Sequence, residues 1–191
     1  MKVSPQLDRR FRSAALADRL LDVAYDLSDS PLGTLLLART DHGLCRIEYD
    51  PEPDRDVETL ARTFGRRVLR TPGALDDARR QLEEYFEGKR RLFELELDLG
   101  LADKPFSRRV LEELARVPYG EVTTYGSLAA QAGRPRAARA VGTVMNRNPI
   151  PIVLPCHRVV GASGSLVGYG GGLPRKEALL RLESALDPSL L

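Results

Sequence analysis

The 191-residue sequence has no tryptophan and only two cysteines, Cys45 and Cys156, and two histidines, His42 and His157. These four side chains are too few for a disulfide framework and match no zinc-ligand spacing. No apolar run approaches the ~20 residues that a membrane helix needs, and the N-terminal segment lacks the hydrophobic core of a signal peptide. We therefore expect a globular protein of a reducing, cytoplasmic compartment, with no metal and no membrane partner.

Acidic residues are absent from Val122 to Lys176, a stretch of 55 residues that contains seven lysines and arginines. Residues 1–101 carry 17 basic and 20 acidic side chains, whereas residues 102–191 carry 12 and 7. The net charge of +2 therefore hides an acidic first half and a basic second half. An uncancelled positive field is typical of a protein that binds a polyanion. The preference for arginine, 25 against 4 lysines, explains the bases but not the missing acids.

The first half predicts a small sheet with a helix. Residues 20–27, 35–39 and 44–49 are apolar or alternating and lie between turn signals, so we expect strands there. Helical spacing of apolar residues from Leu75 to Phe86, followed by Gly88, predicts a capped helix. Residues 93–99 alternate between apolar and acidic, which is typical of a strand with one wet face. Residues 100–105 are the expected boundary, which gives domains 1–100 and 101–191.

The second half predicts a helix-turn-helix. One helical face contains Phe106, Val110, Leu111 and Leu114, and the next helix begins near Tyr125 and stops at Gly133. In a third helix, Arg136 and Arg139 point away from an apolar face made of Ala137, Ala140, Val141, Val144 and Met145. Two helices joined by a short turn, with arginines facing outward, match the outline of a DNA-binding motif. A helical hairpin of another kind shows the same spacing.

A candidate nucleophile follows. The apolar run 150–154 predicts a buried strand that ends at Cys156, His157 and Arg158, and nearby cations activate a thiol by favouring the thiolate. Adjacent residues of an extended segment point to opposite sides. We therefore expect Cys156 and His157 to contact each other through a water or a local twist of the backbone. The alternative is that Cys156 is a buried structural cysteine.

Six glycines in residues 161–172 predict a mobile loop. The loop is followed by a helix with Leu179, Leu182 and Leu186 on its apolar face.

These segments resemble the O6-alkylguanine-DNA alkyltransferase family. The resemblance lies in PCHRVVGASG, preceded by RPRAARAVGTVMNRNPIPIVL and followed by GYGGG, and it covers roughly residues 20–185. It implies an α/β (α+β) fold, with a ribonuclease H-like N-terminal domain and a helical, winged-helix-like C-terminal domain. It also implies a cofactor-free, monomeric repair protein that moves an alkyl group from guanine in double-stranded DNA onto its own cysteine, once and irreversibly. O4-alkylthymine stays open as a second lesion.

The resemblance also implies roles for single residues. Cys156 accepts the alkyl group, His157 takes its proton through a water, Glu183 orients that histidine and Asn148 braces the turn. Tyr125 donates to the extruded base and Arg139 fills the hole left in the base stack. Further DNA contacts are implied for Arg134, Arg136 and Arg147, and a base pocket for Met145, Pro151, Val159, Tyr169 and Gly170. Three positions, Ser107, Leu111 and Asn146, depart from residues common in the family.

Two other functions compete with repair. A DNA-binding regulator or damage sensor without catalysis would account for the helix-turn-helix and the charge asymmetry, but it needs no thiol beside them. A thiol hydrolase would account for Cys156 and His157, but it would turn over without keeping an adduct.

Overall fold

The computed structural model describes residues 20–185 and isolated earlier positions (4, 6, 7, 10, 12, 14 and 15). The chain forms two compact units, one of residues 1–85 and 94–101 and one of residues 86–93 and 102–191. The division into domains 1–100 and 101–191 stays a prediction. Within the described residues, no helix is long and apolar enough to cross a membrane.

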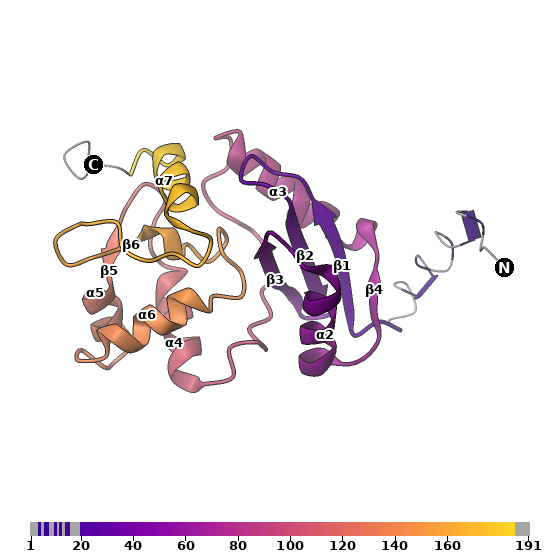
Figure 1. Ribbon diagram of the computed structural model, residues 1–191, viewed down its shortest axis with the longest axis horizontal. Helices are drawn as coiled ribbons and strands as arrows, with labels where there is room; N and C mark the ends of the chain where they lie inside the picture. The colour runs from indigo at the N-terminus through magenta and orange to yellow at the C-terminus, as the bar shows by residue number, and fades with distance from the viewer. Residues whose placement is uncertain are drawn as a thin grey trace. The chain divides into compact units, whose positions relative to one another are not determined.

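The first unit is built on a four-stranded sheet (Figure 1). Its strands are β1 (Val23–Ser28), β2 (Leu35–Thr40), β3 (Gly43–Tyr49) and β4 (Val68–Arg70), in the order β3-β2-β1-β4. The β1–β4 pair is parallel and the other pairs are antiparallel. The three strands expected from the sequence are confirmed, but β1 begins at Val23 because Leu20 is exposed and lies outside the sheet. Strand β4 was not predicted, because its three residues, VLR, are too few to show an alternation of apolar and polar side chains.

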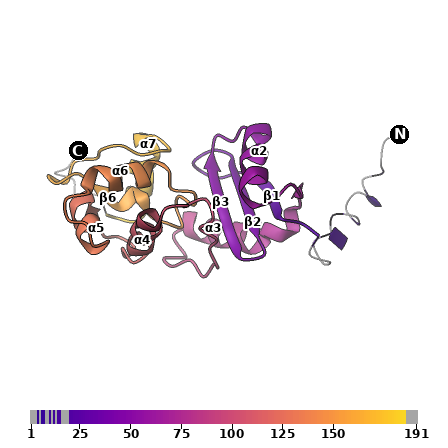
Figure 2. The ribbon, with the colours of Figure 1, turned by 90° about the horizontal axis from the view of Figure 1, so that it is seen from below.

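Helices α2 (Pro53–Phe64) and α3 (Asp76–Phe86) cover opposite faces of this sheet, and a short 3-10 helix, η1 (Pro72–Leu75), precedes α3 (Figure 2). Leu60 of α2 packs into a core cluster with Leu36, Ala38 and Cys45. Helix α3 and its Gly88, which has a φ of 72°, agree with the sequence prediction. Helix α2 was missed because only two of its side chains, Asp56 and Leu60, are buried.

The strand expected at residues 93–99 is wrong. The segment makes a single bridge, in which Leu44 hydrogen-bonds to the backbone of Glu96 and Asp98. The Gln81 side chain of α3 accepts from the Glu94 amide at 2.8 Å and donates to the Glu94 carbonyl at 3.2 Å. A side chain thus satisfies the backbone groups that a neighbouring strand would have used. Exposed Glu94 and Glu96 nevertheless alternate with half-buried apolar residues, whereas Asp98 is half-buried and accepts from the Thr40 hydroxyl at 2.6 Å.

The second unit contains α4 (Pro105–Leu114), α5 (Tyr125–Gln131), α6 (Ala138–Asn146) and α7 (Leu173–Leu182), with a two-stranded parallel ladder of β5 (Thr123–Thr124) and β6 (Val159–Val160). The helix-turn-helix is confirmed: α5 and α6 pack on each other and on α4. The Thr124 hydroxyl caps α5 by accepting from the Ser127 amide at 3.1 Å. Ala140 is exposed, so it does not belong to the apolar face where the sequence placed it.

The buried strand expected at 150–154 is wrong, because these residues form a turn. Ile152 has a φ of 75°, and a single bridge joins Pro151 and Leu154. Prolines at 149, 151 and 155 remove the backbone donors that a strand ladder needs. Cys156 therefore begins a 3-10 turn, η2 (Cys156–Arg158), rather than following a strand.

The buried face of α7 also differs from the prediction. It contains Lys176, Leu179, Leu180 and, at the C-cap, Glu183, whereas Leu182 is only half-buried. Two charged side chains thus lie on the buried face of α7. Of these, Glu183 was expected from the resemblance as the partner of His157, whereas Lys176 was not expected there. Leu186 lies outside the described residues.

Candidate active site

The Asn148 side chain holds Cys156 at the end of the 150–154 turn. The Asn148 Nδ2 group donates to the Leu154 carbonyl at 2.8 Å and to the Cys156 Sγ at 3.1 Å. Its Oδ1 atom accepts from the Ile150 amide at 3.1 Å. A single amide therefore organises the turn and contacts the sulfur, which is 4% exposed.

The surroundings of Cys156 keep its thiol neutral at rest. Burial raises the pKa of this thiol to about 11, because a thiolate loses solvation there. The hydrogen bond from Asn148 and the positive charge of Lys176 act in the opposite direction but are weaker. Desolvation thus outweighs the stabilisation of the thiolate by nearby cations that the sequence suggested.

His157, Arg158 and Glu183 form a buried charged cluster below the turn. Glu183 Oε1 lies 2.9 Å from Nε2 of His157 and accepts from Nη2 of Arg158 at 2.8 Å, while Oε2 accepts from Nε of Arg158 at 2.8 Å. Burial lowers the pKa of His157 and the carboxylate of Glu183 raises it, burial being the larger effect. Arg158 is thus the main ionic partner of Glu183, a contact that the sequence did not predict even though Arg158 adjoins the histidine in PCHR.

The second ring nitrogen of His157, Nδ1, is buried and has no hydrogen-bond partner in the part of the chain that the structure describes. Because Nε2 is engaged by Glu183, the imidazole makes no direct hydrogen bond to Cys156. The histidine is held in one orientation with one nitrogen left to exchange a proton.

A cavity of about 480 Å³ lies beside Cys156. It brings together six residues proposed from the sequence: Tyr125, Arg139, Met145, Arg147, Cys156 and Tyr169. Sequence reasoning missed its other walls, which are Gly142, Thr143, Asn146, Val167 and Gly168. The first three follow Arg139 at spacings of three, four and seven residues on one face of α6, so helical periodicity could have found them.

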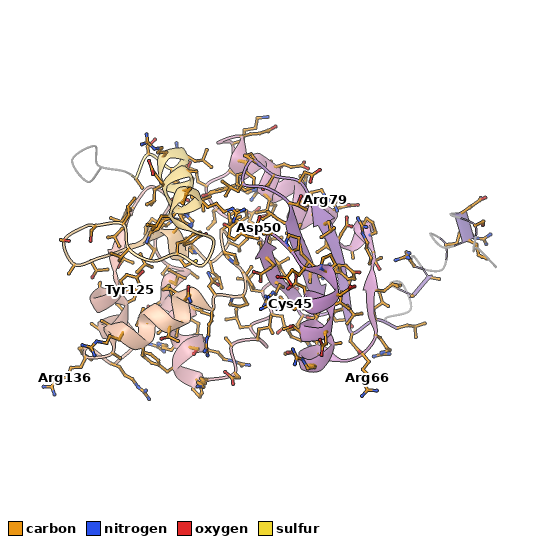
Figure 3. The ribbon with its side chains drawn as sticks, in the orientation of Figure 1. Cys45, Asp50, Arg66, Arg79, Tyr125 and Arg136 are labelled. Carbon is orange, nitrogen blue, oxygen red and sulfur yellow. The ribbon has the colours of Figure 1, made fainter. Side chains whose placement is uncertain are left out.

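Among the residues proposed for the base pocket or for DNA contacts, five do not line this cavity. Pro151 and Val159 are buried in the turn and in β6, and Gly170 is exposed next to Asn146. Arg134 stacks its guanidinium on the Phe106 ring at 4.8 Å. Arg136 extends away from the ribbon in the turn before α6, whereas Tyr125 lies at the start of α5 (Figure 3).

The positive surface of the second unit is smaller than the sequence indicated. Of the seven basic side chains between residues 122 and 176, Arg158 and Lys176 are buried. Arg136, Arg139 and Arg147 are exposed at the helix-turn-helix, and no acidic residue lies between residues 122 and 176 to cancel them. A cavity with a buried thiol thus adjoins a helix that exposes arginines.

Comparison with known proteins agrees with both units. Residues 105–185 match the family model described as the DNA-binding domain of 6-O-methylguanine DNA methyltransferase, and residues 23–99 match its ribonuclease-like domain. The chain belongs to the 6-O-methylguanine DNA methyltransferase family. A methylated-DNA–protein-cysteine methyltransferase of Mycobacterium bovis is 45% identical over 172 residues, covering 87% of this chain and 96% of the relative. One from Salmonella typhimurium is 44% identical over 164 residues, covering 82% and 93%.

Solved structures of the 6-O-methylguanine DNA methyltransferase family show the same α/β fold. The O6-methylguanine methyltransferase of Mycobacterium tuberculosis has a TM-score of 0.70 at 44% identity, covering 87% of this chain and 96% of that one. A structure described as Mycobacterium tuberculosis OGT in complex with DNA has a TM-score of 0.73 at 43% identity, covering 85% and 93%. The small sheet unit and the helical unit described above are therefore those of the family.

Proposed function

We propose that this chain repairs DNA by transferring an alkyl group from O6 of guanine to the Sγ atom of Cys156. The observation that carries the proposal is the placement of Cys156, braced by Asn148 at the wall of a cavity that Arg139 of the helix-turn-helix also lines. The relatives named methylated-DNA–protein-cysteine methyltransferase and the neighbour bound to DNA support the same reaction.

The neutral thiol must lose its proton as it attacks, because the thiolate is the nucleophile. His157 accepts this proton at Nδ1 through a water, since the imidazole makes no direct bond to the sulfur. The imidazolium that forms is stabilised by Glu183 Oε1, and Arg158 holds that carboxylate in place with two hydrogen bonds. Proton transfer thus accompanies the attack instead of preceding it.

During the transfer a bond forms between Sγ and the alkyl carbon, while the bond from that carbon to O6 breaks and its electron pair moves to O6. The guanine anion then takes a proton from the Tyr125 hydroxyl, which recovers one from solvent. In the free protein this hydroxyl donates to the Val167 carbonyl at 3.2 Å, so it must exchange partners when the base arrives. The product is a thioether that these groups do not cleave, so each molecule reacts once.

Guanine O6 lies inside the duplex, so the base must be extruded into the cavity, and the cost of unstacking is a few kcal/mol. Arg139 fills the gap in the stack, as wedge residues of minor-groove proteins do. Arg134, Arg136 and Arg147 contact phosphates. We further propose that the protein acts as a monomer on double-stranded DNA, in the cytoplasm or, in a prokaryote, on the nucleoid.

Duplex DNA that carries O6-methylguanine with a labelled methyl group tests the function. We expect one label per protein molecule, no transfer to the Cys156→Ser variant and full transfer to the matched Cys45→Ser variant. Absence of transfer to the wild-type chain would sink the proposal. Binding without transfer would favour a regulator or damage sensor, and release of the methyl group with turnover would favour a hydrolase.

A further inference from the structure

Lys176 is a fully buried lysine for which the proposed mechanism has no use. Its side chain is 0% exposed on the inner face of α7. The Nζ group donates to the Val159 carbonyl at 2.6 Å and to the Val167 carbonyl at 2.9 Å. A buried ammonium group is costly unless it is paired or hydrogen-bonded, and here backbone carbonyls take the place of an acid.

The two carbonyls belong to different parts of the site. Val159 lies in β6, three residues after Cys156, whereas Val167 lies in the glycine-rich segment 161–172. Val167, Gly168 and Tyr169 form one wall of the cavity. Lys176 therefore ties this wall to the strand that follows the nucleophile.

The Val167 carbonyl also receives the Tyr125 hydroxyl, so donors from α5 and α7 converge on one oxygen atom. Several backbone hydrogen bonds of the glycine-rich segment join its own residues, as in Gly161 to Ser165 and Gly172 to Tyr169, and at its end the Lys176 amide donates to the Gly172 carbonyl at 3.3 Å. When Tyr125 turns to a base, the bond from Lys176 still holds the wall in place.

We propose that Lys176 is a positioning residue for alkyl transfer, whose buried ammonium group fixes the 167–169 wall against β6 and places a positive charge near the Cys156 sulfur. The inference rests on the proposed function for its role in repair. It assigns to Lys176 both the shape of the cavity and part of the stabilisation of the sulfur anion.

The electrostatics of the site agree with this role. Burial lowers the pKa of Lys176 to about 8, so the group is still mostly protonated at neutral pH. Its charge lowers the pKa of Cys156, and a Cys156 thiolate raises the pKa of Lys176 in return. Loss of the ammonium group should therefore release the 167–169 wall from β6 and also make the thiolate form of Cys156 less stable.

The test compares Lys176→Met with Arg181→Met, which removes a positive charge from an exposed position on the same helix. Both variants carry Cys45→Ser, so that chloroacetamide reports Cys156 alone. For Lys176→Met we expect chloroacetamide alkylation at pH 7, where Lys176 carries its charge, to slow about threefold or more, because a smaller fraction of Cys156 is then thiolate. Transfer from free O6-benzylguanine should slow ~10-fold or more, and Arg181→Met should match the parent in both assays. A folded Lys176→Met variant that matches Arg181→Met would overturn the inference.

If Lys176→Met does not fold, amide hydrogen exchange of the unmodified chain tests the same link. After correction for intrinsic rates, protection of the Gly161 and Gly172 amides should fall several-fold between pH 7 and about pH 9.5, while α4 stays protected. Unchanged protection would contradict the role. Because chloroacetamide needs no DNA, failure of the repair function would leave the result for Lys176 interpretable.

Discussion

The two units each bury a cysteine, and the two cysteines have different surroundings. Cys45 is 0% exposed in β3 among Leu36, Ala38 and Leu60, and burial raises its pKa to about 12. Cys156 is 4% exposed, accepts a hydrogen bond from Asn148 and borders a cavity. Burial makes both thiols weak acids, so burial does not distinguish them. The difference lies in the space beside Cys156 and in the groups that can take its proton.

The two units also each bury a carboxylate, and the two carboxylates differ in how exposed their cationic partners are. Asp26 in β1 is met by Arg70 and Arg79, whose side chains are 52% and 24% exposed. Glu183 is met by Arg158, 8% exposed, and by the fully buried His157. The first cluster is open to solvent on its cationic side, whereas the second is enclosed. We therefore expect the enclosed cluster to depend far more on each of its members.

The largest expected effect follows from this contrast. Glu183→Gln leaves Arg158 buried without its anion, so the free energy of unfolding should fall by about 3–5 kcal/mol. Asp26→Asn should cost about 1–2 kcal/mol, because water screens the arginines that it leaves. Urea denaturation of both variants measures the difference. If the free energy of unfolding fell equally in the two variants, burial of the Arg158 partner would not be what makes the Glu183 cluster more sensitive.

The next prediction concerns pH. The thiolate is the reactive form, so its fraction, and hence the rate of chloroacetamide alkylation, rises about tenfold per pH unit below the pKa. With a pKa of about 11, Cys156 should show this rise from pH 7 to about pH 10 in the Cys45→Ser variant. Rates followed by intact-protein mass spectrometry test this. A plateau near neutral pH would mean that the resting cysteine is already ionised.

A smaller effect separates the arginines of the two units. Arg139→Ala should slow repair of a duplex by ~10-fold, since unstacking costs a few kcal/mol that this side chain offsets. Transfer from free O6-benzylguanine should change less than about twofold, because no base has to be extruded. The control is Arg62→Ala, which removes an exposed arginine from α2 in the first unit and should leave both rates unchanged. Equal losses on duplex and free base for Arg139→Ala would exclude a role in extrusion.

Sequence reasoning was strongest where periodicity or a motif carried the information. Apolar spacing located three strands and the helix-turn-helix, and the PCHR motif located the turn that contains Cys156. It failed where polar side chains take over backbone hydrogen bonds. Gln81 replaces a strand partner at Glu94, and Asn148 shapes a turn where an apolar run predicted a strand.

Periodicity did not predict the enclosed charges of α7 for a related reason, and only the family resemblance pointed to Glu183. Lys176 and Glu183 occupy core positions of an amphipathic helix, where side-chain type predicts solvent exposure. Their partners lie far away in the sequence or are backbone carbonyls, so no local pattern announces them. Arg158 was visible next to His157, but its link to Glu183 spans 25 residues.

The most direct test of the contrast between the two cysteines is peptide mapping after reaction with O6-methylguanine in duplex DNA. The account predicts one added methyl group, on the peptide that contains Cys156, with the Cys45 peptide unmodified. Methylation of Cys45, or an unmodified Cys156 after the lesion has disappeared, would contradict it.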